Sequence, residues 1–243
     1  GNTSKDAKIA ADLAETTVAV IADAERLGTY ECIPEPDIFD IEYWSLEQAK
    51  LSAAAEKPLA RRIVVVTGGG SGIGAATAAA FAREGAEVAV LDRDVSNVKG
   101  LGIACDVTDP ASVRSAFDKV AATYGGVDIV VSNAGAAWQG KIGEVEEAVL
   151  RQRFELNFWA HQSVAQNAVR IMKAQAIGGC LLFNASKQAV NPGADFGPYG
   201  LPKAATLFLS RQYALDYGAD GIRSNAVNAD RIRTGLLNDD MIA

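Results

Sequence analysis

The sequence predicts an α/β fold: a doubly wound parallel sheet with helices on both faces, preceded by a short helical segment. From residue 59 onward, short runs of β-branched and other apolar residues alternate with longer stretches of helical pattern. Such alternation is typical of parallel strands joined by crossover helices. The strand runs are apolar without interruption, as expected for a sheet that is buried on both faces. We therefore expect two regions, residues 1–58 and residues 59–243.

Residues 1–58 are expected to form a helical segment, which resembles nothing in the alternating pattern that follows. Apolar residues recur at helical spacing near the start of the chain, which predicts an amphipathic helix over residues 6–27. Prolines at both ends of residues 34–36 predict an irregular stretch, and a second helix is expected over residues 42–56. The segment has no obvious core of its own, so we expect it to pack on another part of the protein.

Residues 59–243 are expected to contain six strands and four helical stretches. The strands are expected at residues 63–66, 88–91, 103–105, 127–131, 180–184 and 223–227. The helical stretches are expected at residues 75–84, 110–124, 144–172 and 199–217. Asp109 is placed to cap the second of these helices. The last helix is expected to begin close to Tyr199, because Pro202 is best tolerated in a first turn, where the missing N–H has no intrahelical partner.

Composition and charge exclude several classes of function. The formal net charge is −7, and no run of basic residues extends beyond Arg61 and Arg62, so we expect no nucleic-acid partner. No apolar run is long enough to span a bilayer, so we expect no membrane association. Three cysteines without a paired motif are typical of reduced thiols in a cytoplasmic protein. The single histidine, His161, argues against a metal site and is expected on a helix surface or in packing.

The expected first strand runs into a glycine-rich turn and then into a helix. Glycines let the backbone approach a pyrophosphate closely, and the N-terminus of a helix presents unpaired N–H groups to an anion. Such a turn can also serve only to pack a helix on a strand, but its place between strand and helix favours dinucleotide binding and a Rossmann-type sheet. The candidate cofactor-binding residues of the turn are Gly68, Gly70, Ser71, Gly72, Ile73 and Gly74.

Asp92 and Arg93 are further candidates for cofactor binding, at the end of the expected second strand. A carboxylate at this position can accept hydrogen bonds from the adenosine ribose hydroxyls, and it would repel a 2′-phosphate. Arg93 follows at once and could favour that phosphate, but Asp92 has the more direct position. The pair therefore favours NAD as the cofactor, with NADP as the less favoured alternative.

Several motifs occur together in a characteristic order. Residues 67–74 read T-G-x-x-x-G-x-G, and residues 132–135 read S-N-A-G. Ser186 precedes Tyr199 by 13 residues, and Lys203 follows Tyr199 in a Y-x-x-x-K pattern. In combination these motifs resemble the short-chain dehydrogenase/reductase family over about residues 59–243, with a serine in place of the first asparagine of the family's N-N-A-G element.

The resemblance implies a nicotinamide-dependent oxidoreductase that acts on an alcohol or an aldehyde, and it implies a homo-oligomer, a dimer or a tetramer. The catalytic residues that it implies are Asn157, Ser186, Tyr199 and Lys203. The further cofactor-binding residues that it implies are Asp106, Val107, Asn133, Ala134, Gly135 and Thr234, together with Tyr199 and Lys203.

The chemistry of these residue types supports the assignment. Hydride transfer from an alcohol carbon requires the hydroxyl proton to leave, and Tyr199 is the candidate base. A free tyrosine titrates at about 10, so a nearby cation is needed to lower its pKa. Lys203 shares a helix face with Tyr199, and Ser186 can donate a hydrogen bond to the substrate oxygen. An isolated Y-x-x-x-K pattern is more often a pair on a helix surface, so Ser186 and the glycine turn matter to this interpretation.

A narrower resemblance extends into the first region. Residues 42–51 resemble the tail of a class II aldolase domain, and the segments around Ser186, Tyr199 and Asp230 are similar to bifunctional rhamnulose-1-phosphate aldolase/short-chain dehydrogenases. This resemblance implies that the chain is the dehydrogenase half of a protein fused to a class II aldolase. It also implies lactaldehyde from deoxy-sugar catabolism, here rhamnose catabolism, as a substrate.

Two departures from the family pattern leave a second hypothesis open. Ala229 and Asp230 stand where the family usually has Pro-Gly, and the sequence ends before the usual substrate-covering helix and last strand. A dinucleotide-binding module without turnover would tolerate both departures. A sugar-nucleotide epimerase fits poorly, because its glycine spacing is T-G-x-x-G-x-x-G. Trp138 and Phe196 are candidates for lining the substrate pocket, although core packing explains them equally well.

Overall fold

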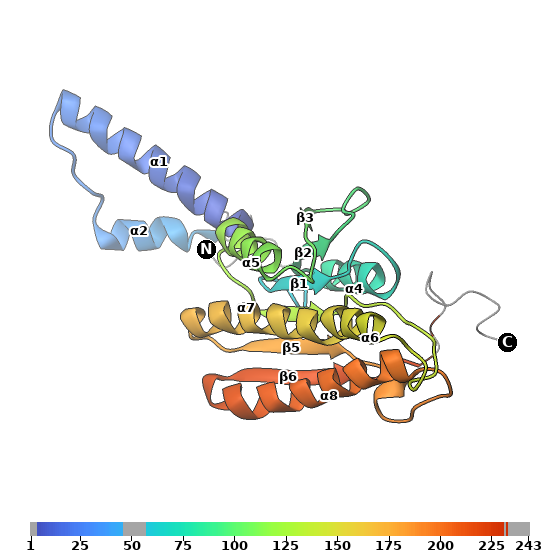
Figure 1. Cartoon of the computed structure of the whole chain (residues 1–243). Helices are drawn as coiled ribbons and strands as arrows, with labels where there is room; N and C mark the ends of the chain where they lie inside the picture. Colours follow the sequence, from blue (N-terminus) through green and yellow to red (C-terminus); the bar gives the residue numbers. More distant parts are fainter. Residues whose placement is uncertain (1–3, 46–56, 231, 233–243) are drawn as a thin grey trace. The chain divides into compact units, whose positions relative to one another are not determined.

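The structure is a computed structural model that describes residues 4–45, 57–230 and 232. The chain divides into two compact units, Gly1–Pro58 and Leu59–Ala243, and each is described by itself. The first unit contains helix α1 (Ser4–Leu27) and helix α2 (Glu35–Glu42), drawn in blue in Figure 1.

Helix α1 confirms the helix expected over residues 6–27, but the irregular stretch expected at residues 34–36 is wrong. Helix α2 begins there, with Pro34 at its N-cap and Pro36 in its first turn. A proline is tolerated at that position because the first N–H groups of a helix have no intrahelical partner. The chain leaves α2 at Tyr43. Most of the helix expected over residues 42–56 lies outside the described residues.

The second unit is built on a parallel sheet of six strands in the order β3-β2-β1-β4-β5-β6. The strands are β1 (Ile63–Thr67), β2 (Glu87–Asp92), β3 (Leu101–Ala104), β4 (Ile129–Ser132), β5 (Gly179–Asn184) and β6 (Ile222–Val227). Every neighbouring pair is parallel; on β1, for example, Val65 lies beside Ala89 of β2 and Val130 of β4. The strand order reverses between β1 and β4. This confirms the α/β fold class and the doubly wound, Rossmann-type sheet.

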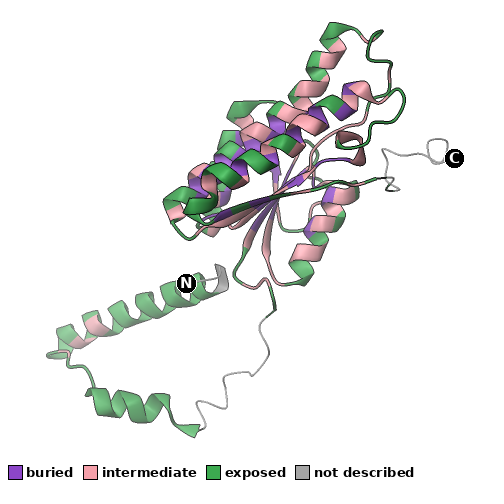
Figure 2. Ribbon diagram, turned by 90° about the horizontal axis from the view of Figure 1, so that it is seen from below, coloured by how far each residue is buried: buried purple, intermediate pink, exposed green. Residues whose placement is uncertain are grey.

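Helices cover both faces of this sheet, as the sequence predicts (Figure 1). They are α4 (Gly72–Arg83), α5 (Pro110–Tyr124), α6 (Glu147–Phe154), α7 (Ala160–Gln175) and α8 (Gly197–Tyr217). Successive strand residues point to opposite faces, so Val65 joins the core under α5, α7 and α8, while Val64 and Val66 join the core under α4. Figure 2 shows the buried residues concentrated in the sheet and on the inward faces of its helices.

Local capping explains where one of these helices begins and ends. Asp109 Oδ1 accepts a hydrogen bond of 2.9 Å from the backbone N–H of Ala111, which confirms the expected N-cap of α5. Gly125 ends the helix in the left-handed conformation that favours glycine, with φ +89°. The two ends of α5 are therefore determined by residues next to it in the sequence.

Two helices differ from the prediction. The stretch expected over residues 144–172 is interrupted by a π-helical segment, Glu155–Trp159, between α6 and α7. Helix α8 begins at Gly197, close to Tyr199 as expected, but two residues earlier. Pro202 is consequently the sixth residue of α8, beyond the first turn. It therefore removes one intrahelical hydrogen bond, which the sequence interpretation did not anticipate.

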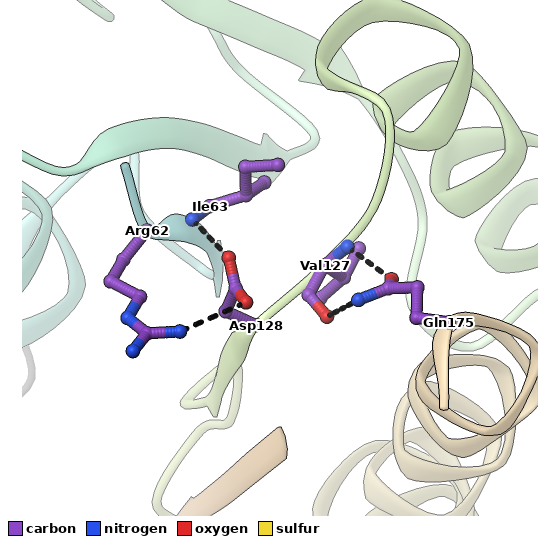
Figure 3. A network of polar contacts seen from close by, with 5 residues as sticks. All are labelled: Arg62, Ile63, Val127, Asp128 and Gln175. Carbon is purple, nitrogen blue, oxygen red and sulfur yellow. Dashed lines mark hydrogen bonds and ion pairs between the residues drawn. The ribbon is translucent and has the colours of Figure 1, made fainter. Parts of the chain in front are cut away.

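Two groups of polar contacts lie at the amino ends of β1 and β4 (Figure 3). Asp128, just before β4, accepts a hydrogen bond of 2.8 Å from the backbone N–H of Ile63 and pairs with Arg62 at 3.5 Å. Gln175, the last residue of α7, bonds both the N–H and the carbonyl of Val127, at 2.7 and 3.2 Å. These contacts brace the edge of the sheet opposite to the carboxyl ends, where parallel sheets bind their ligands.

Candidate active site

A cavity of about 1490 Å³ extends along the carboxyl ends of the strands. Its position, where the strand order reverses between β1 and β4, is the one at which open parallel sheets bind ligands. Most residues proposed from the sequence line it: Gly68, Ser71, Gly72, Ile73, Asp92, Arg93, Asp106, Val107, Asn133, Ala134, Gly135, Ser186, Tyr199 and Lys203. The lining does not include Gly70, Gly74 or Asn157, and Thr234 lies outside the described residues.

The glycine turn connects β1 directly to α4. Gly68 adopts φ +63°, and its N–H bonds the Leu91 carbonyl of β2 at 2.8 Å. A Cβ on Gly74 would lie 2.0 Å from the Gly68 carbonyl oxygen, so Gly74 serves the close packing of the turn itself. The Ser71 side chain makes no capping hydrogen bond to α4. The N–H groups of the first turn of α4 therefore keep their capacity to bind an anion.

Asn133 locks the carboxyl ends of three strands together. Its side-chain N–H₂ donates to the carbonyls of Thr67 and Gly68 at 3.0 and 3.2 Å, and its Oδ1 accepts from Asn184 Nδ2 at 2.8 Å. The Thr67 hydroxyl accepts the backbone N–H groups of Asn133 and Ala134 in return. Asn133 lines the cavity as expected, but the nitrogen and the oxygen of its side-chain amide both already have protein partners.

The carboxylate of Asp92 is held in place by the glycine turn. Asp92 Oδ2 accepts the Gly70 N–H at 2.8 Å, and Oδ1 accepts the Asp94 N–H at 3.2 Å. Arg93 is exposed, and no ion pair between Arg93 and Asp92 occurs among the described residues. The structure therefore brings the turn and Asp92 together, which the sequence could only suggest from their spacing.

Asp106 and Val107 follow β3 at the same end of the cavity. Asp106 Oδ1 accepts hydrogen bonds from the Thr108 N–H and hydroxyl at 2.9 and 2.7 Å. These bonds, with a smaller effect of the Arg93 charge, hold the pKa of Asp106 below its usual range. Val107 is buried. This part of the wall thus combines a fixed carboxylate with an apolar side chain.

Ser186, Tyr199 and Lys203 come from two elements that meet at the other end of the cavity. Ser186 follows β5 and begins a short 3-10 turn, where its Oγ accepts the Gln188 N–H at 3.2 Å. Tyr199 and Lys203 lie one turn apart near the start of α8, and Lys203 Nζ is 5.8 Å from the centre of the Tyr199 ring. Lys203 Nζ also donates to the Asn184 carbonyl at 2.7 Å.

Burial dominates the titration of this group. Lys203 is 2% exposed, and desolvation lowers its pKa from 10.5 to about 7. Burial raises the pKa of Tyr199, and a hydrogen bond with Ser186 opposes that rise in part. The direction for Tyr199 is opposite to the one expected from a nearby cation. The reason is that desolvation is the largest effect on the phenol, and the hydrogen bond with Ser186 offsets it only in part.

Asn157 lies in the π-helical segment and acts on the loop beside Lys203. Its Oδ1 accepts the Ala136 N–H at 3.2 Å and its Nδ2 donates to the Ala136 carbonyl at 3.1 Å. A Cβ on Gly135 would lie 2.8 Å from Asn157 Oδ1 and 3.3 Å from Lys203 Nζ. Asn157 is fully buried, so it fixes this close approach of loop and lysine while remaining outside the cavity lining.

Two polar residues beside Lys203 were missed by the sequence interpretation. His161 was expected on a helix surface or in packing; at 1% exposed it is a packing residue, and it also contacts both Lys203 and Ser132. Asn184 holds Lys203 through its carbonyl and Asn133 through its side chain. A signal was available: Ser132 replaces an asparagine in the S-N-A-G motif, and His161 lies one helical turn after Asn157.

Three further expectations concern the cavity wall: the aromatic candidates Trp138 and Phe196, and the segment Ala229-Asp230 that replaces Pro-Gly. Phe196 lines the cavity, but Trp138 does not; its ring stacks on the Arg153 guanidinium at 4.2 Å. The Ala229 carbonyl accepts the Lys187 N–H at 2.8 Å, and Asp230 pairs with the Lys187 side chain at 3.8 Å. The departure from Pro-Gly thus leaves a segment that is bound to the 3-10 turn after β5 and still lines the cavity.

Among residues 4–45, 57–230 and 232, no cluster of three or more His, Cys, Asp and Glu side chains has the arrangement of a metal site. No helix within that part of the chain is long and apolar enough to cross a membrane.

Comparison with known proteins gives two family matches. The short chain dehydrogenase model matches residues 62–241, and the model of the second domain of class II aldolases matches residues 1–51. The chain is 32% identical to the uncharacterized oxidoreductase YuxG of Bacillus subtilis, over 96% of this chain and 37% of that protein. It thus spans little more than a third of that relative.

Two further comparisons cover most of both partners. The chain is 34% identical to (−)-isopiperitenol/(−)-carveol dehydrogenase of Mentha piperita, over 75% of this chain and 74% of that protein. The solved 3-ketoacyl-(acyl-carrier-protein) reductase of Brucella melitensis, complexed with NADH, has 26% identity and a TM-score of 0.69, covering 72% of this chain and 78% of its own. Every residue of the candidate site lies within the matched residues 62–241.

Proposed function

This chain belongs to the short-chain dehydrogenase family, and from that premise we propose that it transfers a hydride between NAD(H) and the alcohol or carbonyl carbon of a small hydroxy compound. The observation that carries the proposal is that Ser186, Tyr199 and Lys203 line the same cavity as the glycine turn and Asp92. A proton-transferring group and a dinucleotide cradle in one cavity are what such a reaction requires.

The residues present fit a dinucleotide. The cavity exceeds the roughly 300–1,000 Å³ of a typical small-ligand pocket, which leaves room for a cofactor and a substrate together. The uncapped start of α4, lined by Ser71, Gly72 and Ile73, would hold the pyrophosphate. Asp92 would hold the adenosine ribose, and the wall at Asn133–Gly135 and Lys203 would hold the nicotinamide half.

The chain's own residues would then move one proton. In the oxidative direction, the Tyr199 phenolate accepts the hydroxyl proton of the substrate. The Ser186 hydroxyl, whose oxygen accepts the Gln188 N–H, would turn its own hydrogen from Tyr199 to the substrate oxygen. The Lys203 ammonium stabilises the phenolate across the 5.8 Å to its ring. A bound oxidised dinucleotide would supply the hydride acceptor and, before the transfer, a positive charge in the same cavity.

Asp92 supports NAD rather than NADP as the cofactor. Its two carboxylate oxygens are fixed by the Gly70 and Asp94 N–H groups, so the negative charge cannot turn away from an incoming 2′-phosphate. Arg93, the residue that could attract that phosphate, is exposed. A fixed carboxylate at this point selects ribose hydroxyls by accepting their hydrogen bonds.

For the substrate we propose a small aldehyde or its alcohol, with lactaldehyde as the specific candidate. The support is the match of residues 1–51 to the second domain of class II aldolases, because an aldol cleavage that releases a small aldehyde would supply such a substrate. The longer protein would then be a fusion of both activities. We also propose a homo-oligomer, a dimer or a tetramer, which light scattering on the purified chain can test.

The test is turnover with NAD and 1,2-propanediol or lactaldehyde, followed through the absorbance of the reduced cofactor. Tyr199→Phe is expected to lower kcat by about 10²–10⁴-fold while the cofactor still binds, because only the proton acceptor is lost. Tyr217→Phe, the same change at the far end of α8, is the matched control and should retain activity. Near-normal turnover by Tyr199→Phe would refute the assigned base. Tight NAD binding without turnover by the wild type would favour the binding-module hypothesis.

A further inference from the structure

Ser132, His161 and Lys203 form a buried chain of polar contacts behind the candidate active site. Ser132 Oγ lies 2.6 Å from His161 Nδ1, and His161 Nε2 lies 3.4 Å from Lys203 Nζ. The three residues come from β4, α7 and α8, and they are 3%, 1% and 2% exposed. Burying an imidazole beside a buried lysine destabilises the fold unless each ring nitrogen has a hydrogen-bond partner of the complementary kind, a donor for an acceptor.

The charge states of the chain follow from its chemistry. An ammonium group has three N–H donors and no acceptor, so a protonated Lys203 requires Nε2 of His161 to be the acceptor. The proton of a neutral imidazole then sits on Nδ1 and donates to Ser132 Oγ. Burial and the charge of Lys203 both lower the pKa of His161 well below its usual value, so the ring is neutral at physiological pH.

Three side chains from three different elements face the imidazole. Lys203 faces the ring from α8, Ser132 from β4, and the Phe183 ring from β5 at 6.2 Å between centroids. Lys203 is the single charged group that perturbs the pKa of His161 among the described residues. Lys203 in turn faces Tyr199 on its own helix and the Asn184 carbonyl on β5.

We propose that His161 is a positioning residue for Lys203: its neutral ring, oriented by Ser132, accepts a hydrogen bond from the ammonium and keeps the lysine charged beside Tyr199. Two of the three N–H groups of Lys203 are then held by protein, one by the Asn184 carbonyl and one by His161. The third is left for the cavity that Lys203 lines. The effect of His161 on catalysis rests on the proposed function, whereas the contact between His161 and Lys203 does not depend on it.

A direct consequence concerns the apparent pKa of the base. Desolvation disfavours the charged lysine, and an acceptor at 3.4 Å opposes that effect by stabilising the ammonium. Without this acceptor, less Lys203 is charged near neutral pH, and the phenolate of Tyr199 loses stabilisation. The acidic limb of the pH profile for alcohol oxidation should then move to higher pH.

The contact can be tested without any activity, because the chain has only one histidine. In ¹H–¹⁵N correlation spectra of the untagged ¹⁵N-labelled protein, His161 is expected as a neutral ring protonated at Nδ1 that does not titrate between pH 5 and 8, about the range of an ordinary histidine. Lys203→Met should shift the Nε2 resonance. An Nε2–H tautomer, ordinary titration at about 6.5, or an unchanged Nε2 signal in Lys203→Met would overturn the proposal.

The effect on the base is tested with variants at position 161. His161→Phe keeps the ring but removes the acceptor, and it should move the acidic limb of kcat/KM upward by about one pH unit, the equivalent of one hydrogen bond to a charged group. His161→Gln places an amide oxygen near the position of Nε2 and should bring the limb back toward wild type. Asn167→Ala, a buried polar residue of α7 away from the site, is the matched control and should not move it.

The outcomes separate the two proposals. An unmoved limb in His161→Phe would overturn the positioning role even if that variant is less stable, because stability alone does not shift a pH profile. If the wild type oxidises no alcohol, the proposed function fails, and the tautomer and the Nε2 shift still decide whether His161 holds Lys203.

Discussion

Replacing Lys203 by methionine should make the folded protein more stable at neutral pH while removing its activity. Lys203 is 2% exposed, and burial lowers its pKa from 10.5 to about 7. Each pKa unit corresponds to about 1.4 kcal/mol, so the difference of about 3.5 units disfavours the charged form in the folded state by about 5 kcal/mol. Methionine has a similar length and no charge, so Lys203→Met removes this penalty.

Lost hydrogen bonds set the size of the net gain. The Asn184 carbonyl and His161 Nε2 lose their partner in Lys203→Met, at 2.7 and 3.4 Å in the wild type. Leaving a buried acceptor unsatisfied costs about 1–3 kcal/mol, and the longer contact is the weaker of the two. We therefore expect Lys203→Met to raise the free energy of unfolding by about 1–3 kcal/mol at pH 6.5.

The pH dependence identifies the cause. In the unfolded chain Lys203 titrates at its ordinary value of 10.5, so between pH 7 and 10.5 the unfolded chain binds more protons than the folded one. The stability of the wild type therefore rises with pH in this window, by up to about 1.4 kcal/mol per pH unit from this group. The penalty is fully present below pH 7 and fades as the pH rises, so the advantage of methionine should vanish by about pH 9.

Urea unfolding followed by tryptophan fluorescence, from pH 6.5 to 9.5, measures this difference without cofactor or substrate. Lys119→Met, at an exposed position of α5, is the matched control and should differ from the wild type by a pH-independent amount. The reasoning is refuted if Lys203→Met is less stable than the wild type at pH 6.5, or if the difference between the two does not change with pH.

Three further changes test the cofactor site and the fold. Gly74→Ala would bring a Cβ to 2.0 Å from the Gly68 carbonyl oxygen, so it should destabilise the turn and weaken NAD binding at least about tenfold by calorimetry; unchanged binding would contradict the packing argument. Asp92→Ala should reduce the preference for NAD over NADP, measured as the ratio of their Kd values, because it removes the fixed carboxylate; an unchanged ratio would show that other residues select the cofactor. Asp109→Ala removes the cap of Ala111 and should lower the free energy of unfolding by about 1 kcal/mol in urea, with NAD binding unaltered; a loss of binding would show that α5 also shapes the cofactor site.

Local signals in the sequence were sufficient for most of the fold. Alternation of apolar strands with helical stretches predicted all six strands of the sheet, because a sheet covered on both faces needs uninterrupted apolar runs. The cap at Asp109 also follows from neighbouring residues. The errors arose where the local signal is ambiguous: prolines at 34 and 36 suit the start of a helix as well as an irregular stretch.

The candidate site was predicted as a set of residue types, but its energetics were not. The spacing of Tyr199 and Lys203 predicted a shared helix face, and the structure shows that they lie one turn apart. The spacing did not predict that desolvation raises the pKa of Tyr199, because the burial of this side chain depends on elements far away in the sequence. The π-helical segment that carries Asn157 was missed for a similar reason, since its contacts with Ala136 span 21 residues of sequence.

Periodicity and spacing along the chain were enough to predict the order of strands and helices, the glycine turn and the residues available for proton transfer. The contacts among Ser132, His161 and Lys203 could not be predicted in this way, since β4, α7 and α8 bring the three residues together across as many as 71 positions (203 − 132). The titration of a buried group depends on desolvation and on partners within a few ångströms, and the packing of the helices on the sheet determines both.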